Sequence, residues 1–214
     1  MTAKVFCAAI VGLEAQAIEV EADVSNGLPA TIIVGLPDAS VQESKERVKS
    51  AVKNSGSNYP STRVSVNLAP ADLPKLGTHF DLPIALAILL SAGQASFNPD
   101  GKMFLGELSL DGKLRGVSGT LAITIKAKEL GFDEIFIPMT NAREAALVEG
   151  IKVYATENLQ SLIEHLQGVK VLKEEPLVEV SQVLMNIRTG LDMKDIAGQE
   201  MAKRALEIAA AGGH

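Results

Sequence analysis

The chain has 214 residues, of which 47% are hydrophobic and 21% are charged, and it carries a net charge of −6 at pH 7. This is the composition of an ordinary globular chain that can bury a sizeable core. The negative charge argues against a free-standing nucleic-acid-binding protein, although a local basic patch remains possible.

Few residues are suited to disulfide or metal chemistry. Cys7 is the one cysteine, which excludes an internal disulfide framework and fits a reducing, cytoplasmic compartment. The histidines (His79, His165 and His214) are scattered without metal-ligand spacing, and two acids such as Asp72 and Asp81 do not by themselves make a metal site. We expect no metal.

The N-terminus predicts strands rather than a targeting segment. Lys4 before the apolar run 5–13 imitates a signal peptide, but the alternating pattern continues past that run to Val24. No apolar stretch has the length of a membrane span, so we expect no membrane partner. The ranges 3–13, 17–24 and 30–34 predict an antiparallel meander.

A helix is predicted over 39–54, with Asp38 as its N-cap and Gly56 after its end. Valines define its buried face, and Glu43 is spaced to pair with Arg47. The valines are Val41, Val48 and Val52, and the opposite face carries Lys45, Lys49 and Lys53.

The middle of the chain predicts a strand, a loop and a buried helix. Residues 63–68 alternate as a strand, and a proline-bounded loop follows over 69–77. Asp81 is the better N-cap than Thr78, because Pro83 then falls in the first helical turn. The helix over 82–90 is apolar all round and should be central.

The rest of the N-terminal part alternates between strands and helices. Asp111-Gly112 joins a strand over 103–110 to 113–117 as a hairpin, in which Glu107 either faces solvent or pairs with Arg115 across the strands. Helices over 119–130, 141–149 and 159–167 alternate with strands over 134–137 and 152–155. This pattern is typical of an α/β fold whose last strands are parallel.

The end of the chain contains Asp195-Ile196-Ala197-Gly198-Gln199 and then a helical run over 200–211. No G-x-x-x-x-G-K-S/T motif occurs in the 214 residues, so the phosphate-gripping loop of a P-loop ATPase is absent. The Ile-x-Gly-Gln segment and the helix after it resemble the part of AAA+ ring ATPases that precedes this loop. The resemblance implies a fragment that stops before an ATPase core, with a domain over 1–168, a linker over 169–190, and the start of the ATPase domain over 191–214.

Three motifs and the chain end together resemble one family. They are Val34-Gly35-Leu36-Pro37-Asp38, Val66-Asn67-Leu68-Ala69-Pro70-Ala71-Asp72-Leu73-Pro74-Lys75 leading into Phe80-Asp81-Leu82-Pro83, and Gly106-Glu107-Leu108-Ser109. These segments, with Gly198-Gln199 and Ala202-Lys203-Arg204-Ala205, resemble the YifB/ComM proteins, or magnesium-chelatase-like AAA+ ATPases.

The resemblance implies a Lon-protease-like fold, an α/β two-layer sandwich of the ribosomal S5 domain 2 type. It implies a hexameric full-length ATPase that uses ATP and Mg²⁺ and acts on single-stranded or branched DNA, including branch migration in natural transformation and recombination. For this fragment it implies no cofactor, because Ile196, Gly198 and Gln199 would contact adenine only with the missing ATPase core.

Peptidase activity would need a serine and lysine pair of the Lon type. Alignment by the motifs puts His79 or Phe80 at the serine position and Leu121 at the lysine position. Ser118 and Lys126 are eight residues apart, roughly 12 Å along a helix, and are a poor substitute. We expect no catalytic residue, and we interpret His79 as a packed or surface residue.

The candidate DNA contacts are cations that could share a surface, and a solvated helix face is the rival interpretation for the lysine row. The candidates are Lys75, Lys113, Arg115, Lys45, Lys49 and Lys53. Two functions stay open: a non-proteolytic domain for ring assembly and DNA guidance, or a protein-interaction or chaperone-type module.

Overall fold

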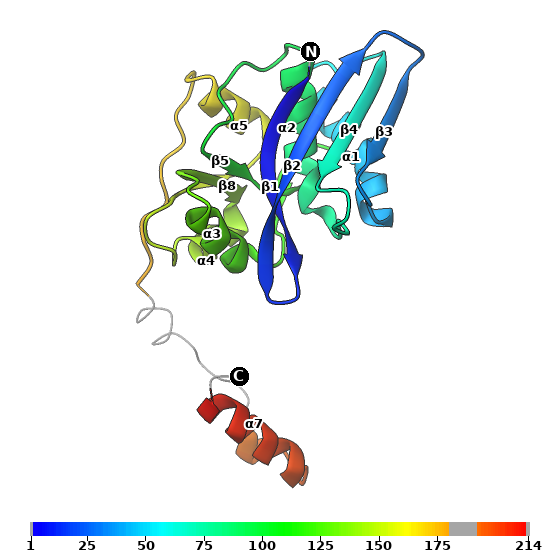
Figure 1. Ribbon diagram of the computed structural model, residues 1–214. Coiled ribbons are helices and arrows are strands. Elements are labelled where there is room, and N and C mark those ends of the chain that lie inside the picture. The colour runs from blue at the N-terminus through cyan, green and yellow to red at the C-terminus, as the bar shows by residue number, and fades with distance from the viewer. Residues whose placement is uncertain (1, 180–191, 213–214) are drawn as a thin grey trace. The chain divides into compact units, whose positions relative to one another are not determined.

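The computed structural model describes residues 2–179 and 192–212, which fall into two units that divide between Val178 and Glu179. The N-terminal unit is built around a seven-stranded sheet (Figure 1). Its strands are β1 (Ala3–Val11), β2 (Glu14–Ser25), β3 (Ala30–Val34), β4 (Arg63–Ala69), β5 (Lys102–Phe104), β8 (Glu134–Pro138) and β9 (Lys152–Thr156). A separate hairpin pairs β6 (Glu107–Leu108) with β7 (Leu114–Arg115).

The helices of this unit are α1 (Ala39–Asn54), α2 (Asp81–Ser91), α3 (Thr120–Glu129), α4 (Ala142–Ala145) and α5 (Leu159–Leu166), with 3-10 turns η1 (Thr78–Phe80) and η2 (Met139–Asn141). The C-terminal unit contains η3 (Met193–Asp195) and α7 (Glu200–Gly212). The expected α/β sandwich is confirmed. No helix in the two described stretches is long and apolar enough to cross a membrane.

The sheet order is β3-β4-β2-β1-β5-β8-β9, and the four strands from β1 to β9 run parallel, as predicted for the last strands. The predicted meander of the first three strands is wrong. β1 and β2 are antiparallel, but β3 pairs in parallel with β4, which lies between β3 and β2. Val64, Val66 and Leu68 of β4 are all fully buried, so β4 takes the interior position and β3 takes the edge.

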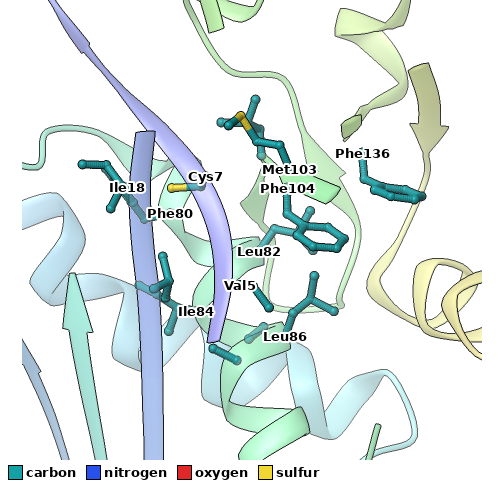
Figure 2. Packing of buried hydrophobic residues seen from close by; sticks show 14 of the residues in the cluster. Val5, Cys7, Ile18, Phe80, Leu82, Ile84, Leu86, Met103, Phe104 and Phe136 are labelled. Carbon is teal, nitrogen blue, oxygen red and sulfur yellow. The ribbon is translucent and has the colours of Figure 1, made fainter. Parts of the chain in front are cut away.

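The core lies between the sheet and α2 (Figure 2). Leu82, Ile84 and Leu86 of α2 share one buried cluster with Val5 and Cys7 of β1, Ile18 of β2 and Phe104 of β5. Side chains of successive strand residues point to opposite faces, so Phe6 and Ile10 face away from α2. Phe6 instead meets Phe132, just after α3, at a ring-centroid distance of 5.4 Å.

The segment expected as one strand over 103–110 is divided between the sheet and the hairpin. The reason is that Gly106 turns toward the start of α2: its N–H donates to the His79 carbonyl at 3.1 Å, and its carbonyl accepts from Leu82 N–H at 3.0 Å. The turn at Asp111-Gly112 and the Glu107–Arg115 pair, with 3.5 Å between charged atoms, are confirmed.

The helix predicted over 141–149 is much shorter. Beyond α4 the hydrogen bonds tighten, since Leu147 and Val148 donate to carbonyls three residues back, Glu144 and Ala145. Glu144 also accepts from the Leu121 N–H of α3 at 3.0 Å. The segment therefore serves as a connection that caps α3.

The division of the chain over 1–168, 169–190 and 191–214 stays a prediction. Residues 180–191 and 213–214, which include most of the expected linker and His214, lie outside the described residues. Within the N-terminal unit, Glu175 N–H donates to the Val153 carbonyl and Val178 N–H to the Ala146 carbonyl, both at 2.8 Å. The chain as far as Val178 is thus tied to this unit.

Candidate functional site

A buried ion pair between α1 and α2 fixes the elements around the candidate site. The Arg47 guanidinium donates from Nε to Asp81 Oδ2 at 2.7 Å and from its second nitrogen Nη2 to Asp81 Oδ1 at 3.0 Å. Asp81 is fully buried and also accepts from Leu108 N–H of β6 at 3.1 Å. One carboxylate therefore joins α1, α2 and the hairpin.

This pair corrects the interpretation of Asp81 as a helix cap. η1 runs directly into α2, so Asp81 is the first helical residue, and its oxygens bind Arg47 and Leu108 instead of the helix N–H groups. Burial raises the pKa of the Asp81 carboxyl to about 6, while the Arg47 guanidinium favours its charged form. The predicted Glu43–Arg47 pair exists at 3.8 Å, with Glu43 exposed.

Lys75 is not available as a DNA contact, because it is fully buried. Its ammonium group donates to the Pro70 carbonyl within the same loop, and its backbone bonds with Leu36 and Asp38 hold that loop beside the start of α1. Burial lowers the pKa of Lys75. The Lys75 side chain thus turns inward and stabilises the proline-bounded loop, instead of extending toward solvent as a DNA contact would require.

The lysine row on α1 lies along a groove. Lys45, Lys49 and Lys53 line a cavity of about 400 Å³ together with Glu46 and Tyr59. Lys49 and Lys53 are exposed and Lys45 is half-buried, and none of the three forms an ion pair within the described part of the chain. The Tyr59 hydroxyl is 2.9 Å from the Thr31 hydroxyl of β3. This contact fixes to β3 the wall of the groove that lies opposite the lysines.

The valine face of α1 is buried as predicted, so packing directs the lysines outward. Asp38 caps the helix by accepting from Val41 N–H at 2.8 Å, as predicted. The three lysines are therefore held on a rigid, capped helix. At four-residue spacing, successive lysines rise by about 6 Å along the axis.

The hairpin cations are exposed but paired. Lys113 lies 3.5 Å from Asp111, and Arg115 lies 3.5 Å from Glu107, with about two-thirds of each basic side chain exposed. Glu107 also accepts from the Thr78 hydroxyl at 2.5 Å. Their charges are partly offset, so the unpaired lysine row offers the stronger site for an anion.

His79 is a packed residue beside a second cavity. Its Nε2 lies 3.0 Å from the Ala8 carbonyl and its ring lies 4.2 Å from that of Phe80. Ser118 lines the same cavity, whereas Lys126 pairs with Glu129 at 3.1 Å. The expected absence of a catalytic serine and lysine pair remains a prediction.

The adenine-side candidates lie in the C-terminal unit. Ile196 is 47% exposed, and Gly198 and Gln199 are also exposed, just before α7. In the two described stretches no group of three or more His, Cys, Asp and Glu side chains could hold a metal ion. An adenine contact at these three residues therefore stays a prediction.

Comparison with known proteins identifies the family. Residues 20–141 match the family described as "Subunit ChlI of Mg-chelatase", and residues 192–214 match "Magnesium chelatase, subunit ChlI". The chain is 41% identical to the uncharacterized protein YifB of Escherichia coli over 208 residues, which is 96% of this chain and 40% of that protein. The chain belongs to the YifB/ComM family.

Other members of the YifB/ComM family are similarly close. Identity is 41% over 212 residues to the competence protein ComM of Haemophilus influenzae, covering 98% of this chain and 42% of ComM. An uncharacterized Mycobacterium tuberculosis protein is 38% identical over 212 residues, 99% of this chain and 41% of that protein. The chain is thus a magnesium-chelatase-like AAA+ protein that spans about two fifths of its curated relatives' length.

The residues that organise the site were only partly visible in the sequence. Arg47 was assigned to its helical neighbour Glu43, since a partner 34 positions away has no periodic signal. The available signal was Asp81 itself, a lone acid at the head of an otherwise apolar helix, because a carboxylate buried there requires a cation or donors. Tyr59 had no such signal.

Lys75→Ala should destabilise the fold. Removing a buried side chain of this length leaves a cavity, and we expect a loss of about 2–4 kcal/mol in the free energy of unfolding. Lys75→Met keeps most of the volume and should lose less. Lys49→Ala, on the exposed face, should change stability by no more than about 0.5 kcal/mol. Urea denaturation measures all three, and wild-type stability of Lys75→Ala would contradict the structural role.

Asp81→Asn should change how stability depends on pH. Because the folded-state pKa of about 6 exceeds the ordinary value of 3.8, the folded protein holds a proton that the unfolded chain has released between these values. The stability from Asp81 is fully present below about pH 4 and falls by about 3 kcal/mol as the pH rises through 6.

Urea unfolding of wild type and Asp81→Asn from pH 4 to 7 measures that change. The advantage of the wild type in the free energy of unfolding should become smaller as the pH rises. Asp100→Asn, at an exposed position, is the matched control and should show no such change. A wild-type advantage that grows with pH would mean instead that Arg47 lowers the pKa of Asp81 below its ordinary value.

Proposed function

We propose that this chain supplies the N-terminal, non-proteolytic Lon-like domain of a ComM/YifB-type hexameric AAA+ ATPase that remodels DNA. In this proposal the domain helps to assemble the ring and guides single-stranded or branched DNA during branch migration in transformation and recombination. The observation that carries the DNA part is the groove beside α1, where unpaired lysines gather on a chain of net charge −6.

The groove favours DNA guidance over a merely solvated helix face. Three cations within about 12 Å of helix can each neutralise a backbone phosphate, and such contacts carry affinity without reading sequence. Hydroxyl groups of Ser61 and Thr62 line the same cavity and can donate to phosphate oxygens. A domain that must let DNA move past it needs contacts of this sequence-independent kind.

ATP and Mg²⁺ belong to the full-length protein in this proposal. The described residues do not fit a complete nucleotide site, since the chain has no phosphate-binding loop motif and Ile196, Gly198 and Gln199 lie on an exposed segment. The part that this chain would play is mechanical: α1 presents the lysines, and the Arg47–Asp81 pair fixes α1 against α2. The cytoplasm is the proposed compartment.

The test replaces Lys45, Lys49 and Lys53 together by glutamine. Binding of fluorescent single-stranded and branched DNA, followed by anisotropy between 50 and 200 mM salt, should weaken roughly tenfold or more in this variant. The slope of log affinity against log salt should fall by about 2 to 3, because up to three phosphate contacts are lost. The variant should fold normally, since the substitutions lie outside the valine face.

A control with the same charge change separates a local contact from net charge. Lys128, Lys170 and Lys173 are exposed elsewhere, and their replacement by glutamine should leave DNA binding close to wild type. Equal loss in both variants would refute the groove as the DNA site. DNA binding absent from the wild type, with capture of a polypeptide, would favour the protein-interaction or chaperone-type module.

A further inference from the structure

The cavity beside η1 has a composition unlike that of the lysine groove. It has a volume of about 490 Å³, and its apolar walls come from Ile10, Leu76 and Val117. Thr78, His79 and Ser118 add polar groups, and three glycines line it without side chains. Mostly apolar walls with a few convergent polar groups are characteristic of a ligand site.

His79 contributes an acceptor atom that is open to the cavity, because no buried side-chain nitrogen or oxygen in the described residues lacks a hydrogen-bond partner. Its Nε2 donates to the Ala8 carbonyl, which places the proton on Nε2 and leaves the lone pair on Nδ1. Burial lowers the pKa of His79 to about 4, so the ring is neutral at pH 7. The residue is only 8% exposed, and Nδ1 has no hydrogen-bond partner among residues 2–179 and 192–212.

The Nδ1 atom lies beside Gly77, and both residues line the cavity. A methyl group built on Gly77 would lie 3.2 Å from Nδ1, so the absence of a side chain there keeps the acceptor accessible. Leu76, next to it, is 60% exposed although it is apolar. An acceptor open to the cavity beside exposed apolar surface is suited to a ligand that brings both a donor and an apolar group.

The surrounding charges exclude an anionic ligand. The Asp38 carboxylate accepts from Gly77 N–H at 3.4 Å, and the Glu107 carboxylate accepts from the Thr78 hydroxyl. Both acids thus contact residues of the cavity wall, and the Arg115 guanidinium already forms an ion pair with Glu107. A phosphate or carboxylate would be repelled here, in contrast to the lysine groove.

We propose that this cavity binds an uncharged amide, such as the backbone of an extended polypeptide segment, with one N–H donated to His79 Nδ1 and an apolar side chain against Ile10, Leu76 and Val117. The site is independent of the DNA groove. It gives the domain a place to hold a protein segment while the α1 face remains free.

N-acetyl-leucinamide is a suitable probe, because it has two amide donors, one apolar side chain and no charge. Titration into the chain labelled with ¹⁵N-histidine should shift the His79 Nδ1 resonance saturably, with a Kd of about 1 mM for a ligand of this size. The same molecule with all three amide hydrogens replaced by methyl groups lacks the donors and should bind roughly five- to tenfold more weakly. Inorganic phosphate should give no saturable shift.

Two variants keep the test decisive. Ser118→Trp fills the cavity from an exposed loop position and should abolish binding, whereas Ser96→Trp, at an exposed position outside the cavity, should not. His79→Phe removes the acceptor, and binding followed from the ligand's own proton signals should weaken by the same five- to tenfold. No saturable shift in the wild type, or binding retained in Ser118→Trp, would overturn the proposal.

Discussion

The arrangement of the N-terminal unit depends on the buried Asp81 carboxylate. A charge taken out of water costs several kcal/mol, and here two nitrogens of Arg47 and the Leu108 N–H offset part of that cost. Because those partners come from α1 and β6, the carboxylate can be satisfied only when both elements sit correctly against α2. The pair thus specifies geometry more than it adds net stability.

The lysine groove and the cavity beside η1 both follow from that arrangement. With Arg47 directed at Asp81 and the valines directed at the core, α1 can present Lys45, Lys49 and Lys53 only to the outside. The turn η1 lies immediately before Asp81 and places His79 next to β1, where a hydrogen bond to the Ala8 carbonyl fixes the orientation of its ring. One surface is cationic and the other is apolar with acids beside it, so the domain offers two chemically different contacts.

Local sequence patterns predicted most of the secondary structure. The features that they did not predict depend on contacts between residues far apart in the sequence. The Asp38 cap, the valine face of α1 and the hairpin turn are set by residues within a few positions, and each was predictable. The position of β3 at the edge of the sheet was not predictable from the sequence. A meander and the observed parallel pairing of β3 with β4 have the same strand pattern, and the burial of β4 decides between them. Likewise, the inward turn of Lys75 depends on a loop shape with no periodic signal.

Placement of DNA along α1 is the central claim, and site-specific photo-crosslinking tests it most directly. A photoreactive residue at position 49 of this chain should crosslink labelled single-stranded DNA, and the same residue at the exposed position 128 should not. Crosslinking at 49 alone is the result that the account predicts. DNA that binds but crosslinks at 128 and not at 49 would contradict it.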